Sequence, residues 1–158
     1  MRIYLVQHGE AVDSGTDPDR PLSARGRNEV TRTARFLRDA GIAVDRIVHS
    51  GKTRARQTAE ILSTELLNAG APEAIAGINP KDAIDPFVAE VNVWSADTLV
   101  VGHLPFMTGA VSCLLLGRPD PDLVDYRPGS VVCLGKDDAG AWHIEWIIRP
   151  ELTASDEH

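Results

Sequence analysis

The stretch Ile3-Tyr4-Leu5-Val6-Gln7-His8-Gly9 decides the fold of this chain of 158 residues. Its first four residues are apolar and prone to form a strand, without the polar alternation of a half-exposed strand. Such a run is typical of a strand that is covered on both faces, as in a parallel sheet. A second stretch, Thr98-Leu99-Val100-Val101-Gly102-His103, has the same character, and a histidine again directly follows the strand.

Helical and strand patterns alternate along most of the chain. In the first three expected helices, apolar residues recur every three or four positions, and cap signals such as Ser23 and Asn79-Pro80 precede them. The expected helices run from Ser23 to Gly41, Lys52 to Gly70, Asn79 to Val91 and about Pro105 to Leu116. Within the third, Pro86 is a point at which the helix can kink or restart. The expected strands are 3–6, 46–49, 98–101, 131–134 and 143–148.

This order of elements predicts an α/β fold. Strands that alternate with helices indicate a three-layer α/β/α arrangement with a mostly parallel central sheet. The last two strands flank the turn Asp138-Ala139-Gly140 and predict an antiparallel C-terminal hairpin. Trp142 and Trp146 are expected on one face of that hairpin, because they lie four residues apart. We expect a single domain over residues 1–158.

Composition and charge exclude several classes of protein. Charged residues make up 25% and hydrophobic residues 43% of the chain, the balance of a soluble globular protein. The net charge of −7 argues against nucleic acid as a partner. No signal peptide or membrane segment is evident. Cys113 and Cys133 lack a disulfide pattern, so we expect two reduced thiols and a cytoplasmic location.

The charge is unevenly distributed. Residues 1–60 carry 11 Lys/Arg and 8 Asp/Glu, whereas residues 61–158 carry 5 and 15. A basic segment in an acidic chain suggests a local site for an anion, since a ligand responds to the local potential.

The two strand-end histidines mark the expected site. Parallel strands would bring His8 and His103 to one sheet edge, where open α/β sheets bind their ligands. Gly9 and Gly102, beside them, allow a bound group to approach the backbone closely. Between the two lies Ser50–Thr58, where a strand gives way to a helix and free N–H groups can bind an anion. Arg54, in the first turn, can add a bidentate contact to phosphate.

Four collinear blocks carry a family resemblance. The segment around Gln7-His8-Gly9-Glu10-Ala11 resembles the Arg-His-Gly signature of the histidine phosphatase superfamily, and the details are most similar to the small SixA-type phosphohistidine phosphatases. The other blocks are Arg20-Pro21-Leu22-Ser23-x-x-Gly26, Ser50-x-x-x-Arg54-Ala55-x-Gln57-Thr58-Ala59 and Val101-Gly102-His103-Leu104-Pro105.

The resemblance implies a phosphatase in which His8 is the nucleophile and a phosphohistidine enzyme forms and is hydrolysed. It implies that Arg54 and His103 hold the phosphate oxygens, together with Gln7 and Gly9. We expect no metal or other cofactor, because the sequence has no metal-ligand motif. The expected partners are phosphate and a phosphohistidine-carrying protein such as a phosphotransfer domain, with no nucleic acid and no membrane.

Gln7 departs from the family signature, which has arginine there. Glutamine keeps a hydrogen-bond donor but loses the charged, bidentate contact. We hypothesise that Arg20 supplies part of the missing charge. Glu10 is a candidate acid or orienting residue.

The other acids in the region before the His103 strand are Glu73, Asp82 and Asp85, which are better explained as capping or solvated residues. A missing acid favours a phosphohistidine substrate, because imidazole leaves more easily than an alkoxide. The alternatives are a phosphatase of small phosphoesters, a mutase, which the short region 70–97 disfavours, and a phosphate-binding module that lost catalysis at Gln7.

Overall fold

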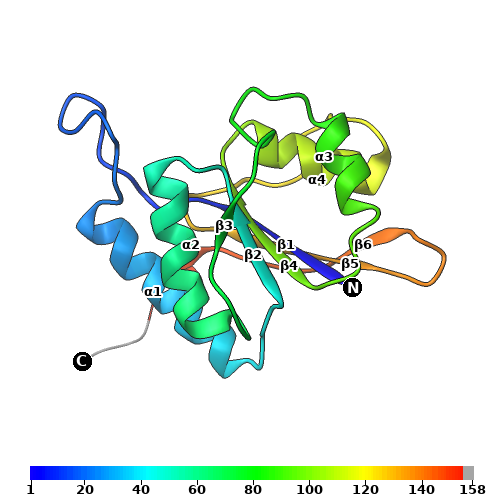
Figure 1. The fold of residues 1–158 in the computed structure, drawn as a ribbon, viewed down its shortest axis with the longest axis horizontal. Coiled ribbons are helices and arrows are strands. Elements are labelled where there is room, and N and C mark those ends of the chain that lie inside the picture. Colours follow the sequence, from blue (N-terminus) through cyan, green and yellow to red (C-terminus); the bar gives the residue numbers. More distant parts are fainter. Residues whose placement is uncertain (155–158) are drawn as a thin grey trace.

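The computed structural model describes residues 1–154, which form one six-stranded sheet with helices on both faces (Figure 1). The strand order is β3-β2-β4-β1-β5-β6. The four strands β3, β2, β4 and β1 are parallel, whereas β5 is antiparallel to β1 and β6 is antiparallel to β5. The predicted α/β fold and C-terminal hairpin are therefore confirmed. The strands are β1 (Arg2–Gln7), β2 (Arg46–His49), β3 (Glu73–Ala74), β4 (Thr98–Gly102), β5 (Val131–Lys136) and β6 (Trp142–Ile148).

Two helices cover each face of the sheet. Helices α1 (Ala24–Asp39) and α2 (Thr53–Leu66) pack on one face, and α3 (Asp85–Val91) and α4 (Phe106–Leu116) on the other (Figure 1). In β1, Tyr4 and Val6 join the core under α1 and α2, while Ile3 and Leu5 join the core under α3 and α4. This double burial explains why the decisive stretch is continuously apolar.

The connections diverge at the carboxyl ends of β1 and β4, which are neighbours in the sheet. The chain leaves β1 toward α1 on one face and leaves β4 toward α4 on the other. Such a switch point is where open α/β sheets bind ligands. The fold thus places both strand-end histidines at the position that the sequence predicted.

Two predicted helices have different bounds in the structure. The helix expected from Asn79 begins only at Asp85, because residues 79–82 form a turn in which the Asp82 carboxylate accepts the N–H of Asn79 at 2.8 Å. Helix α2 ends at Leu66 rather than near Gly70, since the chain there pairs with Val44 instead of continuing the helix. The short strand β3 and the 3-10 helix Pro150–Thr153 were not predicted.

The prediction that both hairpin tryptophans share a face is wrong. A β-bulge shifts the register: Cys133 pairs with Trp146 but Leu134 pairs with Ile144, so Glu145 is an extra residue. Trp142 consequently packs into the core under α3 and α4, whereas Trp146 packs against the opposite core.

None of the helices in residues 1–154 is long and apolar enough to cross a membrane. Both cysteines are buried and unpaired.

Candidate active site

His8 and His103 lie side by side, as the sequence predicted. Each follows its strand directly, and the paired register of β1 and β4 aligns Gln7 with Gly102. The His8 N–H donates to the carbonyl of Gly102 at 3.0 Å, and the ring centroids are 5.0 Å apart. Both residues are buried, with 9% of His8 and 2% of His103 exposed.

The hydrogen bonds of His8 define its tautomer. Nδ1 lies 2.7 Å from the carbonyl oxygen of Gly9, which can only accept, so Nδ1 carries the proton. Nε2 therefore keeps its lone pair, to which Arg54 Nε donates at 3.3 Å. The ring presents an unprotonated Nε2 toward Arg54, and such a nitrogen can act as a nucleophile.

Helix α2 is joined to the end of β1 through Thr58. The Thr58 hydroxyl accepts the N–H of Gly9 at 3.0 Å and donates to the carbonyl of Arg54 at 2.8 Å. The Thr58 side chain is fully buried. It fixes the first turn of α2, and with it Arg54, against the backbone next to His8. Sequence reasoning assigned no role to Thr58 beyond its place in a family block.

Ser50 contacts the second histidine. Its hydroxyl lies 2.6 Å from Nε2 of His103, and it follows β2, the neighbour of β4 on the other side. Ser50 was not among the predicted site residues. Its signal in the sequence is its position directly after a strand that ends at the same sheet edge.

Burial holds both rings neutral. Desolvation lowers the pKa of His8 to about 4, and the charges of Arg54 and Arg20 act in the same direction, while the bond to Gly9 opposes the shift. Desolvation lowers the pKa of His103 to about 3, and His8, Arg54, Lys52 and Arg20 lower that pKa further. Uncharged rings among cations form a site that favours an anion.

Arg20 lies in the loop between β1 and α1, and its charge acts on the histidines from there. Its charge contributes to the lowered pKa values of His8, His103 and Arg54, and its Nε donates to the carbonyl of Val12 at 3.1 Å. Its backbone has φ +48°, the left-handed region, which costs a residue with a Cβ atom about 1–2 kcal/mol. The surrounding loop must hold this conformation.

Gln7 makes no side-chain hydrogen bond to either histidine within residues 1–154. It is the last residue of β1, and His8 follows it. Gln7 Oε1 is buried, and within residues 1–154 it has no hydrogen-bond partner. The described residues show no hydrogen bond between Gln7 and Arg54, and the role of Gln7 in binding phosphate stays a prediction.

Glu10 contacts the start of α1. Its carboxylate accepts the Ser23 hydroxyl at 3.1 Å and lies 3.7 Å from Arg25 Nε. Gly26 packs so closely on Glu10 that a Cβ atom there would lie 2.1 Å from the Glu10 carbonyl oxygen. These contacts favour an orienting role for Glu10 over that of an acid. Gly9 is also tightly enclosed, since a Cβ atom added there would lie 2.7 Å from the Val30 side chain.

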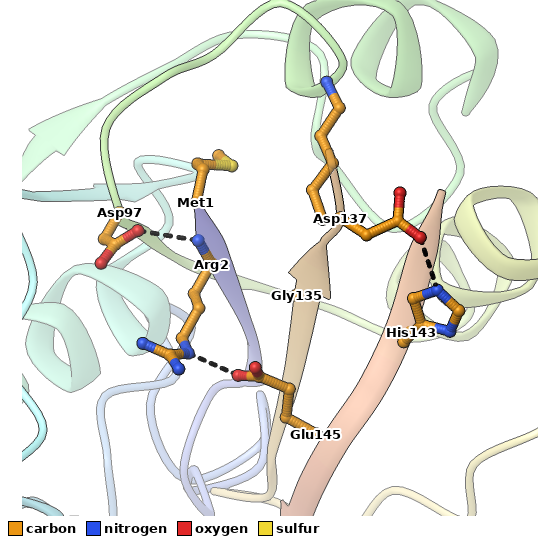
Figure 2. A pocket seen from close by; sticks show the side chains of 8 residues that line it. Met1, Arg2, Asp97, Gly135, Asp137, His143 and Glu145 are labelled. Atoms are coloured by element: carbon orange, nitrogen blue, oxygen red, sulfur yellow. Dashed lines mark hydrogen bonds and ion pairs between the residues drawn. The ribbon is translucent and has the colours of Figure 1, made fainter. Parts of the chain in front are cut away.

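A charged cavity of about 330 Å³ lies at the opposite end of the sheet, near the start of β1 (Figure 2). Its acidic and basic groups satisfy each other: Arg2 pairs with Glu145, and His143 with Asp137 at 2.9 Å. None of the predicted site residues lines it. The lining residues are Met1, Arg2, Asp97, Gly135, Lys136, Asp137, His143 and Glu145.

Comparisons with known proteins agree with this geometry. Residues 3–73, which include His8 and Arg54, match the model of the histidine phosphatase superfamily (branch 1). An uncharacterized protein of Picosynechococcus sp. is 34% identical over 125 residues, which cover 75% of each chain. The phosphohistidine phosphatase SixA of Escherichia coli is 25% identical over 155 residues, 95% of this chain and 94% of that protein.

Solved structures show the same fold. The protein histidine phosphatase SixA complexed with tungstate aligns with a TM-score of 0.84 at 24% identity, covering 98% of this chain and 100% of that one. The aligned region therefore includes the end of β4 and His103.

Proposed function

This chain belongs to the histidine phosphatase superfamily as a SixA-type phosphatase, and from that membership we propose that it hydrolyses protein phosphohistidine through a phosphorylated His8. The observation that carries the proposal is the unprotonated Nε2 of His8, held beside Arg54 and His103. The relative from Escherichia coli bears the name phosphohistidine phosphatase.

In the first displacement, His8 Nε2 forms a bond to phosphorus while the bond from phosphorus to the substrate imidazole breaks. The electron pair of the broken bond stays on the leaving nitrogen, which takes up a proton from water. Arg54 turns from Nε2 to the phosphoryl oxygens as the new bond forms, and together with His103 it stabilises their charge.

In the second displacement, water attacks phosphorus, the bond to His8 Nε2 breaks, and inorganic phosphate and a proton are released. The Gly9 carbonyl keeps the proton on His8 Nδ1, so the ring returns to the same tautomer and orientation. Two displacements at one nucleophile replace one difficult step.

The substrate class follows from the leaving group. Imidazole leaves without the strong acid assistance that an alkoxide needs, and the Glu10 carboxylate is engaged by Ser23 and Arg25. We place the reaction in the cytoplasm, where the thiols of Cys113 and Cys133 stay reduced. The partner is a phosphohistidine-carrying protein.

Arg20 supplies part of the charge that Gln7 lacks. Removing such a donor from a phosphoryl-transfer site lowers the rate by about 10²–10³-fold, so we expect a loss of that order in Arg20→Ala. Gln7→Arg in the Arg20→Ala background should recover part of the rate. The measurement is kcat/KM for phosphate release, and full activity in Arg20→Ala would refute the compensation.

The decisive experiment compares two substrates. The protein is incubated with a phosphohistidine carrier protein and, separately, with a phosphoserine peptide, and phosphate release is followed from each. We expect release from the carrier, loss of that release in His8→Ala, and a phosphorylated enzyme trapped by acid-free electrophoresis. Release from the serine peptide alone would overturn the substrate class. Phosphate binding without turnover of either substrate would instead indicate a binding module.

A further inference from the structure

We propose that Gln57 is a positioning residue, which sets the place of Arg20 by holding the loop that carries it. Gln57 Oε1 accepts the backbone N–H of Leu22 at 2.8 Å, across 35 residues of sequence. Leu22 is two residues beyond Arg20 and is buried, with 5% of its surface exposed. This inference rests on the proposed function, because it assigns Arg20 to the phosphate.

The loop's other hydrogen bonds do not reach α2. Within the loop, the Val12 N–H donates to Pro21, the Arg20 N–H donates to Asp17, and Arg20 Nε donates to Val12. These bonds, and those of Ser23 to Glu10, hold the loop to itself and to the segment after β1, but none of them ties it to α2. In the described part of the chain, residues 1–154, the bond to Gln57 is the hydrogen bond that joins residues 12–22 to α2.

The backbone of Arg20 needs this support. A residue with a Cβ atom stays at φ +48° only when its surroundings hold it there. On the C-terminal side of Arg20, the N–H of Leu22 is the point at which this segment is bound to α2. Without the acceptor on Gln57, that N–H loses its bond in a buried place, so the loop must rearrange to satisfy it.

Helix α2 thereby sets two cations at once. Gln57 lies three residues after Arg54, so both side chains lie on the same side of the helix. Arg54 contacts His8 directly, and Gln57 fixes the loop of Arg20. The charge of Arg20 already acts on Arg54 and on His8. The spacing of the two guanidinium groups around a phosphoryl group therefore depends on one helix.

The test is the affinity for inorganic phosphate, measured by calorimetry without turnover. Gln57→Met removes the acceptor at nearly constant size, and we expect its Kd to rise five- to tenfold. Arg20→Ala should raise the Kd about tenfold. If Gln57 acts through Arg20, the Kd of the double variant Gln57→Met/Arg20→Ala should match that of Arg20→Ala within twofold. The reason is that Gln57 has no further effect on phosphate affinity once the Arg20 side chain is absent. Ser63→Ala, which removes a hydrogen bond within α2, should leave the Kd unchanged.

The outcomes separate this inference from the proposed function. An unchanged Kd in Gln57→Met, or a further five- to tenfold loss in the double variant, overturns the inference alone. Absence of phosphate binding in the unmodified protein overturns both. Coupled losses of phosphate affinity without any release from phosphohistidine would leave the inference standing and refute the proposed substrate.

A conservative variant checks the bond itself. Gln57→Glu keeps an acceptor oxygen at the same position, so hydrogen exchange of the Leu22 amide should stay slow. In Gln57→Met the same amide should exchange at least tenfold faster, while the Gly9 amide, held by Thr58, stays protected. Equal exchange of the Leu22 amide in both variants would show that Gln57 does not hold the loop.

Discussion

His8 should stay unprotonated at pH values well below those at which a solvent-exposed imidazole takes up its proton. The cause is burial of the ring, which lowers its pKa to about 4, with smaller effects from Arg54 and Arg20. At pH 5, a ring with this pKa is about 90% neutral, whereas a ring with the ordinary value of about 6.5 is about 3% neutral. The neutral form of His8 should thus be about 30-fold more abundant at pH 5 than the neutral form of an exposed histidine.

The same shift has a consequence for stability. A histidine whose pKa is lower in the folded protein binds fewer protons there than in the unfolded chain. Its contribution is complete above the unfolded value of about 6.5 and is lost as the pH falls toward the folded value. Between pH 7 and pH 5, this linkage amounts to about 2 kcal/mol for each buried ring, and His103 follows the same direction with a pKa of about 3.

The assay is an NMR titration of the histidine ring protons from pH 8 to pH 4, in which His8→Ala assigns the signal. Urea unfolding at pH 7 and pH 5 measures the change in stability. In Arg54→Gln, the pKa of His8 should rise but stay below 6.5, because burial is the larger cause. A His8 signal that titrates near 6.5 would refute the reasoning, as would equal stability at the two pH values.

Three further predictions concern residues around His8 and the segment that follows it. Thr58→Val leaves the buried Gly9 N–H without a partner, so the free energy of unfolding should fall by about 1–3 kcal/mol. Thr58→Ser keeps the hydroxyl, and its free energy of unfolding, measured by urea titration, should stay within about 1 kcal/mol of that of the unmodified protein. Gly26→Ala forces a Cβ atom onto the Glu10 carbonyl and should destabilise by about 1–3 kcal/mol; an unchanged urea midpoint would contradict this. Arg54→Lys keeps the charge but loses the forked donor, so kcat/KM should fall about 100-fold; retention of most activity would show that charge alone suffices.

The apolar runs at residues 3–6 and 98–101 predict the sheet well because their information is local. Each strand is buried on both faces, so nearly every residue must be apolar, and the histidine after each one must lie at the ligand-binding edge. The cap of α1 could be predicted for the same reason, because the Ser23 hydroxyl accepts the N–H of Gly26, which is close in sequence.

Features that depend on distant partners were not predictable. The end of α2 depends on pairing with Val44, in the connection before β2. The late start of α3 has a local cause instead, because the Asp82 carboxylate accepts the backbone N–H of Asn79 in a turn that replaces the first helical turn. The bulge at Glu145 arises from pairing across the hairpin, so alternation within one strand could not predict which face each tryptophan takes.

In the site, Ser50 and Thr58 act through contacts with His103 and Gly9, which are 53 and 49 residues away. Periodicity and caps carry no information on such contacts. The sequence did predict the three side chains that meet, His8, Arg54 and His103, because each stands at the end of a strand or the start of a helix. Their catalytic roles stay predictions.

The two outer strands of the sheet determine whether another chain can add a strand at either edge. An unpaired strand edge is a template on which another chain can add a strand and start to aggregate. Here one edge is β3, with only two residues, and the other is β6, whose bulge interrupts the regular spacing of its backbone groups. Exposed Ile144 and Ile147 on β6 would otherwise favour such addition. Because one edge strand is short and the other is interrupted, we expect little strand addition at either edge of the sheet that carries His8 and His103.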